Sequence, residues 1–274
     1  MSFYFEDQTS PQIGDYARRN ALIIIPVGMI EQHGPHLPVS TDNIIARGVA
    51  RLLAERIQDE IPTLVMPCVF TGYNGENVNL WPGSAKVLPE TLYHYVFDMC
   101  EALIKGGFKK IMFINSHGQN PAILELVSRR LTDLHGVIPV LTFAMGMIGK
   151  EGAAIRTSAQ GGAGTHACEI ETSLVLALKP ELVDMSLAPN STCRYRSPFH
   201  PADMYPEEPA KAKVYMSMWE LQRTDTGVLG DASAATAEKG KLWLDLIINN
   251  YVDLAHEYYH LEENLPPLRQ VISY

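Results

Sequence analysis

The sequence predicts an α/β fold with a mainly parallel central sheet, and two observations lead to this prediction. Short apolar runs rich in β-branched residues alternate along the chain with segments whose apolar residues recur at helical spacing. Strands that alternate with helices are joined by right-handed crossovers, which produce a mainly parallel sheet. The chain has 274 residues, of which 46% are hydrophobic, so it can bury a core without disulfide or metal staples.

Four segments are predicted as buried strands, because each is short, apolar and bounded by turn-forming residues. They cover residues 22–27, 63–70, 110–115 and 137–143. Helical periodicity predicts helices over residues 43–58, 90–105, 120–136, 168–178 and about 234–260. Asn120 and Pro121 indicate a helix start, as an N-cap residue followed by proline at the first helical position.

Residues 186–225 are predicted as an irregular, proline-rich excursion rather than a linker, since the segment also carries aromatic residues such as Tyr205 and Trp219. One long helix follows it, which is too little to form a second core. We therefore expect a single domain over residues 1–274.

The charge balance excludes one class of partner. With 22 Lys+Arg against 31 Asp+Glu, the formal net charge is −9, and no basic cluster is present that would read a nucleic-acid backbone. No leader segment and no apolar run of about 18 residues is seen, so a cytoplasmic protein without a membrane span is expected. The four cysteines form no CxxC pair, whereas nine histidines favour imidazole and carboxylate ligands for any bound metal.

Polar clusters follow the predicted strands, at the edge of a parallel sheet where ligands bind. The first contains Glu31 and His33, with Asp42 at the start of the next helix; the second contains His117; the third contains His166, Glu169 and Glu171. Asp42 alone is equally well explained as a helix cap. His117 alone is more often a structural histidine than a ligand. Their convergence at two strand ends instead predicts a site for a divalent ion.

Four segments of the chain together resemble the creatininase family, also called creatinine amidohydrolase-like proteins. They read IIIPVGMIEQHGPHLPVSTD, INSHGQN, THACEIETSLVLALKPELVD and GVLGDASAATAEKGKLWLD, and they span nearly the whole chain. The resemblance implies a three-layer α/β/α domain, a homo-oligomer that is often a hexamer, and two divalent ions per chain. Zinc is the first expectation for these ions, and manganese or iron are alternatives.

The resemblance also implies roles for individual residues. Glu31 and His117 would hold one ion, His33 the other, and Asp42 both. Two such ions lower the pKa of water and polarise a substrate carbonyl. His166 matches the family histidine that transfers a proton to the leaving group.

Two differences from creatininase itself limit which of these residue roles can be transferred to this chain. Gln119 stands where creatininase has a glutamate ligand, so we expect Glu171 to complete the second metal site, with Glu169 as the alternative. His166 then has to lie in the loop before the helix, because residues five apart do not share a helical face. The Trp-Asp pair that creatininase places beside its substrate is also missing, so creatinine is not the expected substrate.

A polar loop after the second strand is expected to form a wall of the substrate pocket, although its asparagines and glycines are also typical of turns. The residues predicted to bind a small polar substrate are Gln119, Glu76, Asn77 and Trp81. Trp81 is equally well explained by packing.

The leading hypothesis is therefore a metal-dependent hydrolase in which water attacks a carbonyl of a small cyclic amide or amide-like substrate. Within the same chemistry, the alternative is hydrolytic C–C ring opening of an oxidised carbocycle such as 3-dehydro-scyllo-inosose, whose leaving carbanion is stabilised as an enolate. A hypothesis of another class is a non-catalytic subunit that binds a small molecule.

Overall fold

The structure is a computed structural model that describes residues 2–76, 80–159, 161–163, 166–192, 195–212, 214 and 224–261. Its centre is a four-stranded parallel sheet in the order β2-β1-β3-β4. The strands are β1 (Leu22–Val27), β2 (Thr63–Val65), β3 (Lys110–Asn115) and β4 (Val140–Phe143). The predicted fold class, α/β with a parallel central sheet, is confirmed.

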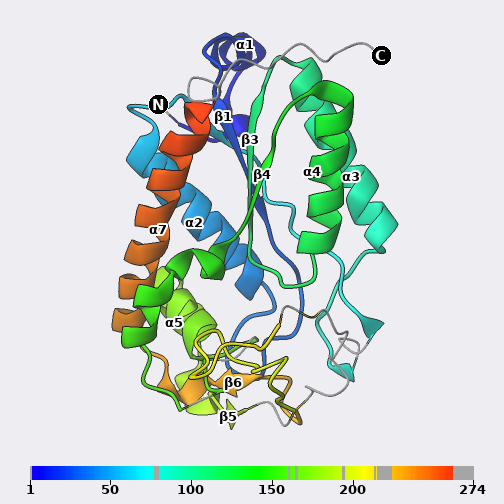
Figure 1. Cartoon of the computed structure of the whole chain (residues 1–274). Coiled ribbons are helices and arrows are strands. Elements are labelled where there is room, and N and C mark those ends of the chain that lie inside the picture. Colours follow the sequence, from blue (N-terminus) through cyan, green and yellow to red (C-terminus); the bar gives the residue numbers. More distant parts are fainter. Residues whose placement is uncertain are drawn as a thin grey trace.

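Helices cover both faces of this sheet (Figure 1). One face carries α2 (Thr41–Ile57), α5 (Glu169–Leu178) and α7 (Ala237–Tyr259), and the other carries α3 (Pro89–Lys105) and α4 (Pro121–His135). Successive strand residues point to opposite faces, so Leu22 and Ile24 enter the first core while Ile23 and Ile25 enter the second. The three-layer α/β/α arrangement follows from this alternation.

Prolines shorten two of the predicted strands. The strand expected over residues 63–70 ends at Val65, because Pro67 has no N–H to donate to the ladder, and pairing resumes only at the isolated bridge between Val27 and Val69. The strand expected over residues 137–143 begins at Val140, directly after Pro139. The prediction was wrong at these two ends.

Two asparagines near helix starts have side chains that serve other contacts. α2 begins at Thr41, and the Asn43 amide donates to the carbonyls of Met29 and Phe70 at 3.1 and 2.8 Å. Asn120 is the N-cap residue of α4 and Pro121 its first helical residue, as predicted, but the Asn120 side chain makes no cap bond; its amide instead donates to the Gly28 carbonyl at 3.0 Å. Both side chains connect loops at the carboxyl ends of the strands.

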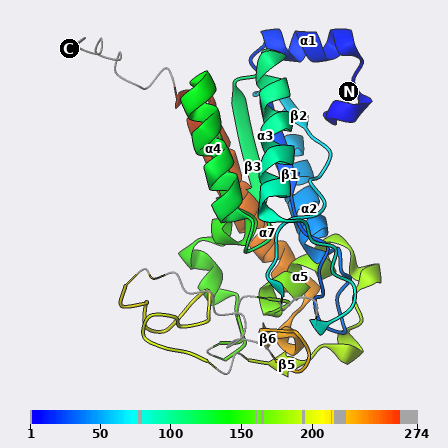
Figure 2. The same ribbon diagram turned by 90° about the vertical axis from the view of Figure 1, so that its right-hand side faces the viewer.

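One helix and a pair of short strands were not predicted. Helix α1 (Ser10–Arg18) begins with a capping box between Thr9 and Gln12, and β5 (Asn190–Ser191) pairs antiparallel with β6 (Gly230–Asp231). Figure 2 shows α1 at one end of the molecule and the β5–β6 pair at the other, together with the described part of residues 186–225. That part is mostly irregular, as expected, and lies at the end of the sheet where the strands finish.

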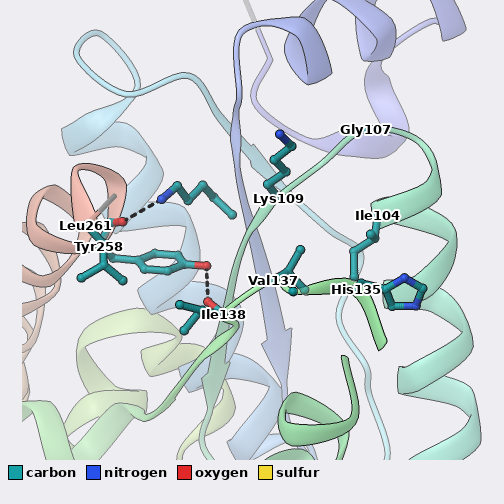
Figure 3. A pocket seen from close by; sticks show the side chains of 10 residues that line it. Ile104, Gly107, Lys109, His135, Val137, Ile138, Tyr258 and Leu261 are labelled. Carbon is teal, nitrogen blue, oxygen red and sulfur yellow. Dashed lines mark hydrogen bonds between the residues drawn. The ribbon is translucent and has the colours of Figure 1, made fainter. Parts of the chain in front are cut away.

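The opposite end of the sheet holds a cavity of about 310 Å³ beside the start of β3 (Figure 3). Tyr258 lines it, accepting from the Ile111 amide at 3.0 Å and donating to the Ile138 carbonyl at 2.6 Å. The Lys110 ammonium donates to the Tyr258 carbonyl at 3.3 Å. These bonds attach the C-terminal turn of α7 to β3.

Among the described helices, none combines the length and the apolar character that crossing a membrane requires.

Candidate metal centre

Five polar side chains meet where β1 and β3 end. The loop after β1 supplies two of them, the first turns of α2 and α5 supply one each, and the segment after β3 supplies the fifth. They are Glu31, His33, Asp42, His117 and Glu171, and each residue is at most 2% exposed. Buried charges are costly unless they are paired or coordinate a metal, so this group requires compensation.

The first triad consists of Glu31, Asp42 and His117. The His117 Nδ1 lies 3.0 Å from Glu31 Oε1 and 3.1 Å from Asp42 Oδ2, and the His117 Nε2 donates to the Tyr73 carbonyl at 2.9 Å. In a neutral ring, Nδ1 therefore directs a lone pair at two carboxylate oxygens. A second proton on the ring or a cation among the three ligand atoms relieves that repulsion.

The second triad consists of His33, Asp42 and Glu171, so Asp42 belongs to both triads. The His33 Nδ1 donates to the Glu31 carbonyl at 3.2 Å, which leaves a lone pair on Nε2. That Nε2 is buried, makes no hydrogen bond, and lies 3.5 Å from Asp42 Oδ1. An orphaned imidazole nitrogen that faces carboxylates is what a metal ligand looks like before the ion binds.

Asp42 is not a helix cap. The N-cap residue of α2 is Ser40, and Asp42 is the second residue of the helix, with its two oxygens divided between the triads: Oδ1 faces His33 and Oδ2 faces His117. The alternative interpretation of Asp42 as a simple cap is therefore wrong.

Charges of opposite sign shift the pKa values of these groups. Burial by itself would raise the pKa values of Asp42 and Glu31. The His33 ring beside Asp42 and the His117 ring beside Glu31 outweigh burial, so both pKa values lie below the usual range. Burial opposes protonation of His33 as well, yet Asp42 raises its pKa to about 9. Burial raises the pKa of Glu171 to about 7, although His33 opposes this shift. In the absence of an ion, protons on the imidazoles balance the carboxylates.

His166 lies in the loop before α5, as predicted, and forms an isolated bridge with Leu229. The His166 Nδ1 is 3.6 Å from Glu31 Oε1, and its ring centre is 4.3 Å from that of His33. Its Nε2 is 2.8 Å from the Gln32 carbonyl. Burial, reinforced by the His33 charge, lowers the pKa of His166 to about 4. The ring is therefore neutral near pH 7 and faces the edge of the first triad.

Glu169 and Glu171 lie in the same helical turn but face different neighbours. The Glu169 carboxylate accepts from the Lys239 ammonium at 2.6 Å and from the Thr157 amide at 3.0 Å. Glu171 instead accepts from the Ala167 amide and lies with the second triad. Geometry thus favours Glu171 over Glu169 as the carboxylate that replaces the missing family ligand.

Gln119 does not reach either triad in a contact of the described residues. Its Nε2 donates to Asn74 Oδ1 at 2.6 Å, and its Oε1 accepts from the Gly75 amide at 3.1 Å. Asn74 in turn donates to Glu31 Oε2. These bonds place Gln119 behind Glu31, and its contact with a substrate stays a prediction.

The other predicted substrate residues belong to the loop after β2. The Glu76 carboxylate is 85% exposed and pairs with Lys86, and Trp81 is partly buried in the same loop. Asn77 lies outside the described residues. A role for these three residues in substrate binding stays a prediction.

Sequence reasoning missed the part played by Gln32. Its Oε1 accepts from the Gly34 amide at 3.0 Å, and its Nε2 donates to the Gly227 carbonyl at 3.1 Å and lies 3.0 Å from His166 Nε2. Gly227 has a φ of 77°, and a Cβ there would lie 2.2 Å from Gln32 Oε1. The available signal was its position between Glu31 and His33, where an extended segment points its middle side chain away from its neighbours.

Comparison with known proteins assigns the chain to a family. The family model described as "Creatininase: Creatinine amidohydrolase" matches residues 6–255. The chain belongs to the creatininase family. It is 29% identical to the creatinine amidohydrolase of Pseudomonas putida, over 88% of this chain and 91% of that protein. It is also 26% identical to the 3-dehydro-scyllo-inosose hydrolase of Thermotoga maritima, over 90% of this chain and 80% of that protein.

Solved structures of the family agree with the fold. A manganese form of creatininase superposes with a TM-score of 0.77 at 25% identity, covering 94% of this chain and 99% of its own. A zinc–zinc form of a creatininase mutant gives the same TM-score at 26% identity, with the same coverage of both chains. The relatives of this chain are hydrolases, and the chain has buried groups of ligand atoms that could hold metal ions. The chain is therefore a metal-dependent hydrolase.

Proposed function

We propose that this creatininase-family hydrolase holds two divalent ions in the two triads and opens a small cyclic amide or amide-like substrate. The observation that carries the proposal is the sharing of Asp42: its two oxygens face His117 of one triad and His33 of the other. A single carboxylate with a ligand group on each side is suited to hold two ions close together.

The ligand atoms fit such ions. The buried Nε2 of His33 has no hydrogen-bond partner, and the Nδ1 of His117 faces two carboxylate oxygens. Three carboxylates and two imidazoles are a mixed oxygen and nitrogen set that suits zinc first, and manganese or iron as alternatives. The zinc and manganese forms of the similar solved structures support the same choice.

When bound, the ions lower the pKa of water and polarise a carbonyl oxygen. His166 supplies the proton transfer in this proposal. In the metal-free protein its ring is neutral near pH 7, because burial and the His33 charge lower its pKa to about 4, and its Nδ1 faces Glu31 at 3.6 Å. The Nδ1 takes a proton from the attacking water and passes it to the departing nitrogen, while the Gln32 carbonyl fixes the ring at Nε2.

The bond that is cut defines the choice between two substrate classes. Cyclic amides are the first choice, in line with the amidohydrolase relative. Creatinine itself is not expected, since the segment before His166 lacks a Trp-Asp pair. The second candidate is C–C ring opening of an oxidised carbocycle, and the similarity to the Thermotoga maritima enzyme supports it. The hydrolase relatives disfavour a non-catalytic binding subunit.

The experiment that tests this proposal combines metal loading with a substrate panel. Zinc-loaded protein is incubated with creatinine, other cyclic amides and 3-dehydro-scyllo-inosose, and both new amine groups and new carboxylic acids are measured. An acid formed from a cyclic amide together with its freed nitrogen group, an amine or for creatinine a guanidine, supports the cyclic-amide proposal, whereas an acid formed from 3-dehydro-scyllo-inosose, which contains no nitrogen, supports C–C cleavage. Turnover that persists undiminished in Asp42→Asn would contradict the role of the triads in either reaction.

We also propose that the chain forms one domain and acts in the cytoplasm as a homo-oligomer, a hexamer by family resemblance. The charge balance, with its absence of basic clusters, supports a small-molecule substrate rather than nucleic acid. Light scattering coupled to size-exclusion chromatography measures the oligomer directly.

A further inference from the structure

Residues 73–75 and residues 117–120 face each other behind the first triad and are joined by four hydrogen bonds. The Tyr73 amide donates to Asn120 Oδ1 at 3.1 Å, and the Tyr73 carbonyl accepts from His117 at 2.9 Å. Gln119 contributes the other two, with the side chain of Asn74 and the amide of Gly75. The two segments are therefore fixed relative to each other at the point where they meet the triad.

The two amide side chains in this contact, those of Gln119 and Asn74, are oriented by a chain of hydrogen bonds that starts at the Gly75 backbone amide. The backbone N–H of Gly75 can only donate, so it faces Gln119 Oε1. The Nε2 of Gln119 then faces Asn74 Oδ1, at 2.6 Å. The remaining end of Asn74 is its Nδ2, which donates to Glu31 Oε2. The direction of the chain of bonds, from Gly75 to Glu31, follows from donor and acceptor chemistry alone.

This chain of bonds divides the two oxygens of Glu31 between different tasks. Oε2 accepts from Asn74, and Oε1 lies 3.0 Å from His117 Nδ1 in the first triad. Hydrogen bonds behind a ligand orient it and raise its metal affinity. Without Asn74 in this orientation, the Glu31 carboxylate would be free to rotate about its terminal torsion.

We propose that Gln119 is a positioning residue that acts through Asn74 to hold Glu31 for the first triad, and thereby sets the metal affinity of that triad. The proposal rests on the proposed function only in requiring that the first triad binds an ion. The family resemblance places a glutamate ligand at position 119, yet here the Gln119 side chain is engaged behind Glu31 by bonds at 2.6 and 3.1 Å. Gln119 would thus act on the first triad indirectly, through its bond to Asn74 and the bond from Asn74 to Glu31.

The test measures zinc and manganese binding by isothermal titration calorimetry, with no substrate required. Glu171→Gln serves as the background, because it disables the second triad and leaves the first triad to be measured alone. Adding Gln119→Met, which keeps the side-chain length but removes both bonds, is expected to weaken binding roughly 10- to 100-fold. Asn74→Ala is expected to weaken it similarly, and the two changes together no more than either alone.

A matched control separates this effect from general damage to the loop. Lys86→Met removes a different contact with the same segment, the ammonium bond to the Asn74 carbonyl at 3.4 Å, and is expected to leave affinity within about twofold. Unchanged melting of the metal-free Gln119→Met protein would show that the fold is intact.

Three results would overturn the proposal. They are unchanged affinity in Gln119→Met, fully additive losses with Asn74→Ala, and an equal loss in Lys86→Met. A different result bears on the proposed function: if the unmodified protein binds two ions, the two-ion centre of the proposed function stands even where the Gln119 proposal fails. If neither the unmodified protein nor Glu171→Gln binds an ion, both fail.

Discussion

The two triads share Asp42 and both have partners behind their other members, but they differ where an ion would bind. From behind, Asn74 and the Tyr73 carbonyl bond Glu31 and His117, and the Ala167 amide and the Glu31 carbonyl bond Glu171 and His33. In the first triad, His117 Nδ1 lies 3.0 and 3.1 Å from two carboxylate oxygens, whereas in the second the His33 Nε2 makes no hydrogen bond and lies 3.5 Å from Asp42 Oδ1. The ligand atoms of the first triad are therefore drawn together before an ion arrives, whereas in the second an ion would complete the bonding. We expect the first triad to bind more tightly.

The largest expected effect comes from the residue common to both triads. Asp42→Asn removes the shared charge, so both ions should be lost and turnover should fall by more than about 10³-fold. Metal content measured by mass spectrometry and turnover with the active substrate check this. Asp184→Asn is a matched control, because Asp184 only caps a short 3₁₀ helix, and it should keep both ions. Retention of both ions in Asp42→Asn would refute the sharing of this residue.

A loss confined to chemistry is expected at His166. His166→Ala should lower turnover by about 10²- to 10⁴-fold, the range for a proton-transfer group, with both ions retained. Metal analysis beside the kinetic measurement distinguishes proton transfer from ligation. If His166→Ala loses an ion, the residue is a ligand, because its Nδ1 lies only 3.6 Å from Glu31 Oε1.

The neighbouring glutamates of α5 should have separate phenotypes. Glu171→Gln is expected to lose one ion, while Glu169→Gln keeps both and lowers the free energy of unfolding by about 2 kcal/mol, since it weakens the bonds from Lys239 and Thr157. Metal counting and thermal melting of both variants test this pair. The opposite assignment, with Glu169→Gln losing the ion, would exchange their roles.

Affinity should also depend on pH differently in the two triads. Protons compete with ions for the same atoms, so affinity rises with pH wherever binding releases protons. The second triad has two such groups, His33 with a pKa of about 9 and Glu171 with a pKa of about 7. In the first triad, only His117 has a raised pKa, while that of Glu31 is lowered. Between pH 6 and 8, calorimetry should show the steeper rise for the second triad; equal slopes would argue against the difference.

Sequence was sufficient where a local pattern determines the structure. The apolar runs of β1 and β3 were predicted with their observed bounds, because strands buried on both faces have no polar interruptions. Helix α1 was missed because it has only nine residues, includes a proline and a glycine, and its apolar stripe is limited to the partly buried Ile13, Tyr16 and Ala17. Pro67 cut β2 short through a hydrogen bond it cannot make.

The candidate site was predicted in part for the same reason. Glu31, His33, Asp42, His117 and Glu171 were singled out from segments that follow strands or precede helices, and the fold brings all five together. Side-chain direction was not predictable in the same way: Gln119 was expected to face a substrate, but its bonds lead through Asn74 to Glu31. Such choices depend on partners distant in sequence, which a local pattern does not contain.

The most direct test of the shared-Asp42 centre is a crystal structure of the zinc-loaded protein with anomalous scattering recorded at the zinc edge. The account predicts two anomalous peaks, one on each side of the Asp42 carboxylate, with Glu31 and His117 at the first and His33 and Glu171 at the second. A single peak, or a second ion held by Gln119 or Glu169 in place of Glu171, would contradict it.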